Sequence, residues 1–155
     1  MDDAQVPGLW LLLAQLGKRI FRQSNEEKMG IPMRHFLALG LLRGYEGLSQ
    51  QALAELLCTD ANNLVILLNE LEADGLATRR RDPLDRRRHI VEITPAGRKA
   101  VARAEKELAP HEAEVLAGLS RQELIELRRL LIRALGPTAV AVEAPPADLA
   151  AHTAS

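Results

Sequence analysis

Apolar residues recur at helical spacing through most of the 155-residue chain. A first helix begins near Pro7, since proline suits the first helical position, and its apolar stripe comprises Leu9, Leu12, Leu13, Leu16 and Ile20. The polar run Arg22 to Lys28 ends this helix, and Pro32 opens a second one that reaches Arg43. The chain therefore starts with two helices.

Two further helices follow closely. Ser49 is a good N-cap for a helix over about 50–57, and Thr59 or Asp60 caps the next one. That next helix carries a core stripe of Leu64, Leu67, Leu68 and Leu71, and Gly75 is placed to end it. A short helix, a tight turn at Cys58-Thr59 and a longer amphipathic helix make the layout of a helix–turn–helix, although any helical hairpin shares it.

The pattern changes between Ala77 and Thr94. Residues 78–81 and 89–93 alternate or are β-branched, and Asp82-Pro83-Leu84-Asp85 between them is typical of a turn, which together predict a β-hairpin. A helix–turn–helix followed directly by a hairpin is the order of a winged helix–turn–helix.

Two helices complete the pattern. Thr94-Pro95 caps and opens a long helix, which Pro110 should kink or interrupt. The capping box at 120–123 begins a last helix that runs to Leu135, where Gly136-Pro137 ends it. Residues 137–155 are rich in Ala and Pro and predict a flexible tail.

Composition narrows the function classes. The net charge of −1 gives the whole chain no electrostatic attraction to nucleic acid or to anionic membranes. Aromatic residues make up only 3%, which disfavours binding of single strands by base stacking. The single cysteine permits no internal disulfide, and the apolar run 9–14 is too short for a membrane span and lacks the flanks of a signal peptide. We expect a cytoplasmic protein with no membrane partner, found at the nucleoid when bound to DNA.

The charge is unevenly distributed. Residues 76–99 hold eight cations and three anions, so this segment carries +5 and the remaining 131 residues carry −6. A solvated hairpin in an Arg-rich protein is one interpretation, with 16 Arg against 4 Lys in the chain. Two clusters of three arginines, 79–81 and 86–88, instead favour a polyanionic partner because such close like charges repel one another.

Residues 48–98 resemble the core of the multiple antibiotic resistance regulator (MarR) family. The similarity lies in Leu71-Glu72-Ala73-Asp74-Gly75-Leu76, Arg79-Arg80, Asp82-Pro83-Leu84-Asp85-Arg86-Arg87 and Val91-Glu92-Ile93-Thr94-Pro95-Ala96-Gly97. The order of elements agrees over residues 7–135. The resemblance implies a winged-helix homodimer that usually represses transcription and often releases DNA when a small ligand or an oxidant binds.

The resemblance also assigns roles to residues. Arg86 and Arg87 match tip arginines that enter the minor groove, and Asp85 matches an aspartate that orients an arginine. Many members carry arginine where this chain has Ile66 and Glu70, so we expect the wing to supply most of the electrostatic affinity. The full set of expected DNA contacts is Ser49, Gln50, Thr59, Ala61, Asn62, Asn63, Ile66, Arg79, Arg81, Arg86, Arg87 and Arg88.

The fold class that follows is mainly α with a small β-hairpin wing. Residues 31–94 would form the winged helix–turn–helix, and residues 1–30 with 95–136 a helical dimerisation region. The last helix has eight apolar residues among 15, more than one core-facing stripe needs. Burial within the monomer is the alternative; we expect a dimer through Leu9, Leu12, Leu13, Leu16, Leu124, Leu127, Leu131 and Leu135.

Other chemistry is weakly signalled. No catalytic or metal-ligating pattern is evident, so we expect neither an enzyme nor a cofactor. Trp10, His35, Phe36 and Tyr45 are the candidates for an effector pocket. Cys58 is expected to be a buried inert thiol, with a redox-responsive regulator as one alternative and a protein–protein module with little DNA readout as another.

Overall fold

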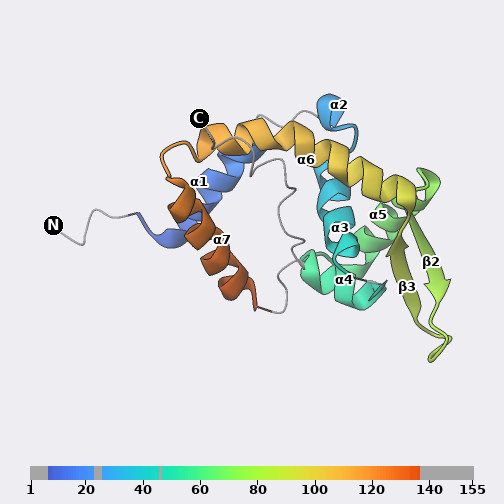
Figure 1. Ribbon diagram of the computed structural model, residues 1–155. Coiled ribbons are helices and arrows are strands. Elements are labelled where there is room, and N and C mark those ends of the chain that lie inside the picture. The colour runs from blue at the N-terminus through green and yellow to red at the C-terminus, as the bar shows by residue number, and fades with distance from the viewer. Residues whose placement is uncertain (1–6, 23–25, 46, 137–155) are drawn as a thin grey trace.

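The computed structural model describes residues 7–22, 26–45 and 47–136. Figure 1 shows their order along the chain. The elements are α1 (Leu9–Arg22), α2 (Glu26–Met29), α3 (Met33–Arg43), β1 (Leu48–Ser49), α4 (Gln50–Leu56), α5 (Ala61–Ala73), β2 (Ala77–Arg81), β3 (His89–Ile93), α6 (Pro95–Val115) and α7 (Arg121–Leu135).

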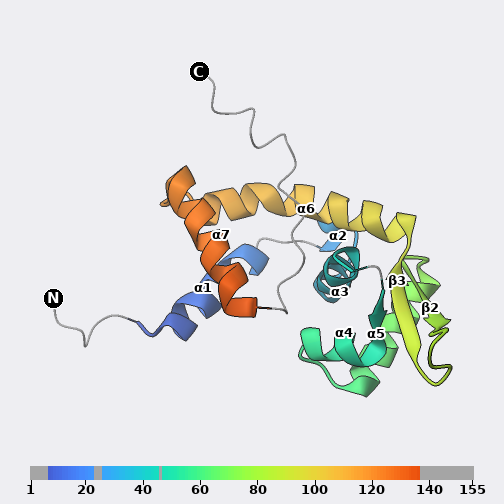
Figure 2. The same ribbon diagram turned by 60° about the horizontal axis from the view of Figure 1, so that its bottom comes forward.

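Helix α6 crosses the molecule and joins its two ends (Figures 1 and 2). At one end α3, α4 and α5 pack with the sheet, and at the other α1 and α7 lie together. Helices α1, α2 and α3 all pack against α6. The described chain thus contains the winged helix–turn–helix that the sequence predicted, and α6 joins it to α1 and α7.

The sheet has three antiparallel strands in the order β1-β3-β2. In the predicted hairpin Ala77 pairs with Ile93 and Arg81 with His89. Strand β1 was not predicted, because its two residues are too few to show an alternating pattern. In the structure Leu48 pairs with Val91, so that β1 lies along the edge of β3 opposite to β2. The wing is therefore tied to the start of the helix–turn–helix.

The core lies in the winged half of the molecule. Its fully buried large side chains are Leu39, Leu42, Leu53, Leu64, Leu68, Leu71, Val91 and Val101. The stripe predicted for α5 is confirmed, since Leu64, Leu67, Leu68 and Leu71 are all buried. This packing fixes which face of α5 remains outside.

Side-chain caps begin the helices where the sequence predicted them. Ser49 accepts from the Ala52 N–H, Thr94 from the Gly97 N–H, and Ser120 forms the full capping box with Glu123. Between the two candidates for the α5 cap, the structure selects Asp60, which accepts from the Asn63 N–H. Four boundaries are thus set by local chemistry.

Two helices differ in detail from the sequence prediction. The polar run before Gly30 was expected only to end the first helix, but Glu26–Met29 forms α2, whose Met29 is buried against the core. Helix α6 was expected to be kinked or interrupted at Pro110; it is not interrupted, since it continues to Val115. Pro110 and Lys106, whose carbonyl loses its donor, are both exposed, so water can satisfy that carbonyl.

Helices α1 and α7 contribute no buried residue. Leu9 is 71% exposed and Leu135 is 56% exposed, so the alternative in which the last helix is sunk in the core of its own chain is wrong. Apolar faces on two neighbouring helices remain without cover in the described monomer.

No helix within the described ranges is both long and apolar enough to cross a membrane. The predicted tail at 137–155 lies outside the described residues.

Candidate nucleic-acid interface

The start of α5 presents a small polar and apolar surface. Asn63 donates from its side-chain Nδ2 to Asp60 Oδ2 at 2.5 Å and from its backbone N–H to Asp60 Oδ1 at 2.9 Å. The backbone hydrogen bond is the main reason why the pKa of Asp60 lies below its ordinary value. Ala61, Asn62 and Ile66 are exposed beside them, with Ile66 at 58%. The expected base-facing residues therefore share one open face, and Asn63 is held in a fixed orientation.

Glu70, the acid that departs from the family pattern, is turned toward α3. Arg34 Nη2 lies 2.8 Å from its carboxylate, and His35 Nε2 lies 2.9 Å from Oε2. These hydrogen bonds, with the His35 contact the largest cause, lower the pKa of Glu70. Its negative charge is thus matched by a cation from the same domain, and repulsion of a phosphate is weaker than the sequence alone suggested.

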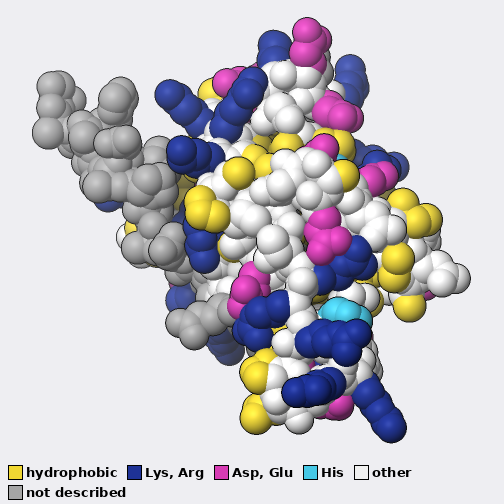
Figure 3. Space-filling view, turned by 90° about the vertical axis from the view of Figure 1, so that its right-hand side faces the viewer, with side chains coloured by type: hydrophobic (Ala, Val, Ile, Leu, Met, Phe, Trp, Pro, Cys, Tyr) yellow, Lys and Arg dark blue, Asp and Glu magenta, His cyan; other side chains and the backbone are white. Residues whose placement is uncertain are grey.

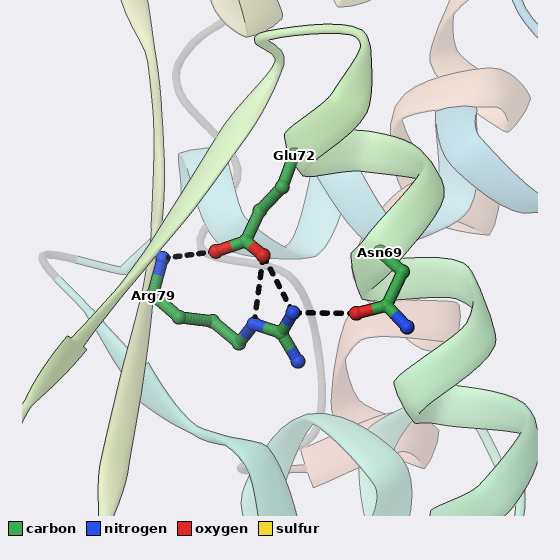
Figure 4. A network of polar contacts seen from close by, with 3 residues as sticks. All are labelled: Asn69, Glu72 and Arg79. Atoms are coloured by element: carbon green, nitrogen blue, oxygen red, sulfur yellow. Dashed lines mark hydrogen bonds and ion pairs between the residues drawn. The ribbon is translucent and has the colours of Figure 1, made fainter.

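Arg79, which was expected to contact DNA, is hydrogen-bonded to α5 in the structure. Figure 4 shows its guanidinium between two side chains of α5. Nε donates to Glu72 Oε2 at 3.0 Å and Nη2 to Asn69 Oδ1 at 2.6 Å, while the Arg79 backbone N–H donates to Glu72 Oε1 at 2.9 Å. These bonds lower the pKa of Glu72. Arg79 therefore braces the wing against α5.

The wing tip turns through two aspartates. Asp82 Oδ1 accepts from the Leu84 N–H at 2.9 Å, and Asp85 Oδ1 accepts from the Arg87 N–H at 3.0 Å. Asp85 was expected to orient an arginine side chain; in the described structure its carboxylate orients the backbone of Arg87 instead. Both carboxylates are thereby used in shaping the turn.

Four arginines remain for a partner at this tip. Arg80 is paired with Glu92 at 2.8 Å, but Arg81, Arg86, Arg87 and Arg88 are exposed and form no ion pair within the described part of the chain. Figure 3 shows Lys and Arg side chains gathered at the wing end of the molecule. Within the positive segment predicted from sequence, these four arginines lie at the hairpin tip, and we call them the wing-tip patch (Arg81 and 86–88).

Three other expected contacts lie elsewhere in the helix–turn–helix. Ser49 and Gln50 are half-buried at the start of α4, and the Ser49 hydroxyl already accepts from the Ala52 N–H at 3.1 Å. Thr59 is half-buried before α5. The sequence missed Arg34, which lines a cavity of about 310 Å³ with Thr59, Asn63 and Ile66, because nothing in the pattern of α3 signals which side chain reaches α5.

The four candidates for an effector pocket have different surroundings in the described part of the chain. Trp10 is 75% exposed on α1, whereas His35 is 3% exposed and directed at Glu70. Phe36 and Tyr45 pack against the core. An effector pocket formed by these four residues stays a prediction.

Cys58 is exposed, so the expectation of a buried thiol was wrong. It follows the C-cap Leu57 of α4 with a φ of 51°, a left-handed conformation that carries its side chain away from the helix. The redox alternative stays a hypothesis, since no second feature of the described chain accompanies this thiol.

Comparison with known proteins identifies relatives of this arrangement. A model of the MarR family matches residues 29–88. A Thauera aromatica protein, provisionally named as the transcriptional regulatory protein for the hcr operon, is 38% identical over 115 residues, 74% of this chain and 69% of that protein.

Solved structures agree with the fold. A MarR family transcriptional regulator from Rhodococcus sp. RHA1 superposes with a TM-score of 0.73 at 25% identity, covering 83% of this chain and 93% of the other. An E. coli MarR mutant complexed with operator DNA superposes with a TM-score of 0.66 at 23% identity, covering 83% and 94%. With a winged helix–turn–helix and a relative matched over more than two thirds of its length, this chain belongs to the MarR family of DNA-binding transcriptional regulators.

Proposed function

We propose that this chain binds a specific duplex operator as a homodimer and represses transcription from it. The observation that carries the proposal is the wing-tip patch, four exposed and unpaired arginines beside the open face of α5. Phosphates on both sides of a minor groove attract guanidinium groups, and a narrow A/T-rich groove attracts them most. The start of α5 would then read base edges in the adjacent major groove through Asn62, Asn63 and Ile66.

Homodimer formation is supported by the uncovered apolar faces of α1 and α7. A two-fold dimer presents two wings and two α5 helices, and half-sites are then about 10 bp apart in a pseudo-palindrome. Release by a small ligand rests on family membership alone. We would test that release by measuring operator binding in the presence of a panel of small molecules that differ in size and charge.

The central test measures binding to DNA selected from a random-sequence pool at several salt concentrations. We expect affinity to fall steeply with salt, and the double variant Arg86→Ala/Arg87→Ala to bind every sequence more weakly. Its plot of log affinity against log salt concentration should be shallower by about 2 per wing, because each neutralised phosphate contributes roughly 0.9 to the slope. In contrast, Asn63→Ala should change which sequences are selected.

Lys106→Ala/Arg128→Ala is the matched control, since it removes the same charge from exposed positions of α6 and α7. It should leave both affinity and salt slope close to those of the wild type. Wild-type binding that does not weaken with salt, or that disappears in excess competitor DNA, would contradict the proposal. Retention of an acidic protein by the wing arginines with no retention of DNA would favour the protein–protein module.

A further inference from the structure

Leu84 at the wing tip is an unusual residue for its position. It is 95% exposed, more than any other large hydrophobic side chain in the described chain. Tip positions of turns ordinarily carry Gly, Asn, Asp or Ser, which lose nothing in water. A partner that covers such a side chain gains binding free energy, because removing apolar surface from water is favourable.

The tip holds Leu84 in a defined place. The Leu84 N–H donates a hydrogen bond to the Asp82 carboxylate. The Asp82 N–H in turn donates to the Arg88 carbonyl at 2.9 Å. The Arg88 N–H donates to the Asp85 carbonyl at 2.9 Å. Pro83 immediately precedes Leu84 and fixes a further dihedral of the turn. The leucine is thus presented by an ordered turn, so binding costs little ordering of the backbone.

The surroundings of Leu84 specify the chemistry of what covers it. Arg81 precedes it and Arg86, Arg87 and Arg88 follow it, all exposed and without an ion pair in the described residues. A fitting partner carries negative charge around a narrow, partly apolar hollow. The minor groove of duplex DNA has this form, with phosphates on both rims and deoxyribose walls between them.

We propose that Leu84 lies against the floor of the minor groove and discriminates against G·C pairs beneath the wing. This inference rests on the proposed function. In the minor groove an A·T pair presents acceptors only, whereas guanine adds its N2 amino group. A leucine placed there would strip water from that donor without replacing the hydrogen bond, which is unfavourable. At an A·T pair no donor is left unsatisfied.

The test starts from the DNA sequence that the wild-type protein selects. Hydroxyl-radical footprinting identifies the base pair that lies beneath the wing, and three duplexes are made that differ only at this pair. That pair is A·T, G·C or inosine·C, which has the major-groove edge of a G·C pair but lacks the N2 amino group. Wild type should bind the A·T and inosine·C duplexes alike and the G·C duplex about tenfold more weakly. In Leu84→Ser, this difference should shrink to about twofold, because only the arginines then favour the narrow groove.

Two readouts separate contact by Leu84 from an indirect effect. The salt slope of Leu84→Ser should equal that of the wild type, since no cation is removed. Thr78→Ser, an exposed change at the base of the same hairpin, should keep the full discrimination. Circular dichroism verifies that each variant is folded, which we expect because Leu84 contributes nothing to the core.

Full discrimination by Leu84→Ser would overturn this inference and leave the proposed function intact. A uniform loss on all three duplexes with a shallower salt slope would overturn it too, because Leu84 would then act only by placing the arginines. Failure of the wild type to bind any duplex would instead contradict the proposed function itself.

Discussion

At the scale of single residues, several acids of the winged half are engaged by partners in their own domain. Glu70 is held by Arg34 and His35, Glu72 by Arg79, and Glu92 by Arg80. The carboxylates of Asp82 and Asp85 shape the turn beside the wing-tip patch. Each pairing consumes a negative charge that would otherwise face a phosphate. The positive character of the wing tip therefore has two sources: cations outnumber anions in this segment, and the anions are engaged within the domain whereas the four arginines of the wing-tip patch form no ion pair in the described structure.

The contact between Glu72 and Arg79 makes stability depend on pH. Hydrogen bonds from Arg79 hold the pKa of Glu72 below its ordinary value of 4.5 in the folded protein. A depressed carboxyl pKa contributes stability that is present above the unfolded-state value and is lost as the pH falls through the folded-state value. We expect Glu72→Gln to lower the free energy of unfolding by about 1 kcal/mol at neutral pH. The difference from wild type should shrink below a pH of about 4.5.

Urea unfolding followed at neutral and acidic pH measures this difference. Glu107→Gln is the matched control, since Glu107 is an exposed carboxylate of α6 without an ion pair in the described structure. It should leave stability unchanged at both pH values. An equal loss in Glu72→Gln at every pH would show that packing, and not the charge of the carboxylate, makes the contribution.

At the scale of elements, the wing, α5 and α6 meet at one junction. The Thr94 hydroxyl donates to the Gly75 carbonyl at 2.6 Å and accepts from the Gly97 N–H at 3.0 Å. The Thr94 backbone N–H donates to the Leu76 carbonyl at 3.0 Å. One threonine thus caps α6 and ties it to the end of α5. The orientation of the wing relative to α5 follows from this junction and from the Arg79 brace together.

Gly97 permits the close approach at that junction. A Cβ at this position would lie 2.1 Å from the Leu76 carbonyl oxygen, a backbone atom that cannot move aside alone. We expect Gly97→Ala to lower the free energy of unfolding by about 2 kcal/mol or more, because the overlap must be relieved by moving α6 or the strand. Thermal unfolding measures the effect, and Gly118→Ala, with open space around its Cβ position, serves as control. Equal melting temperatures for the two variants would contradict the prediction.

Elements defined by local signals could be predicted from the sequence, and those defined by tertiary contacts could not. The caps at Ser49, Thr94 and Ser120 and the α5 stripe depend on neighbours in the chain, so they are visible in the pattern. Strand β1 exists only because β3 is available to pair with Leu48. The same limit applies to the site: eight of the wing and α5 positions are exposed as expected, but the partner of Arg79 depends on how β2 packs against α5.

At the scale of the whole molecule, two surfaces lie at opposite ends of α6. The wing-tip patch and the open face of α5 are at one end, and the uncovered apolar faces of α1 and α7 are at the other (Figures 1 and 2). If α1 and α7 associate between two copies, each copy keeps its wing free. DNA affinity is then coupled to dimerisation, since both wings contribute to a single binding event only when they are held together.

This coupling predicts the behaviour of a variant in α7. Leu131, 37% exposed and part of no described core, is changed to glutamate. Leu131→Glu should shift the protein from dimer to monomer in analytical ultracentrifugation, because a buried unpaired carboxylate is strongly unfavourable in an apolar interface. Its affinity for the two-half-site operator should fall at least a hundredfold, because only one wing can then bind at a time. Its affinity for a DNA that holds a single half-site should equal the affinity of the wild-type protein for that same DNA.

Gln122→Glu is the control, because it adds the same charge on the same helix at an exposed polar position and should remain dimeric. A Leu131→Glu protein that stays dimeric would place the interface elsewhere, and a monomer with unchanged operator affinity would separate DNA binding from dimerisation.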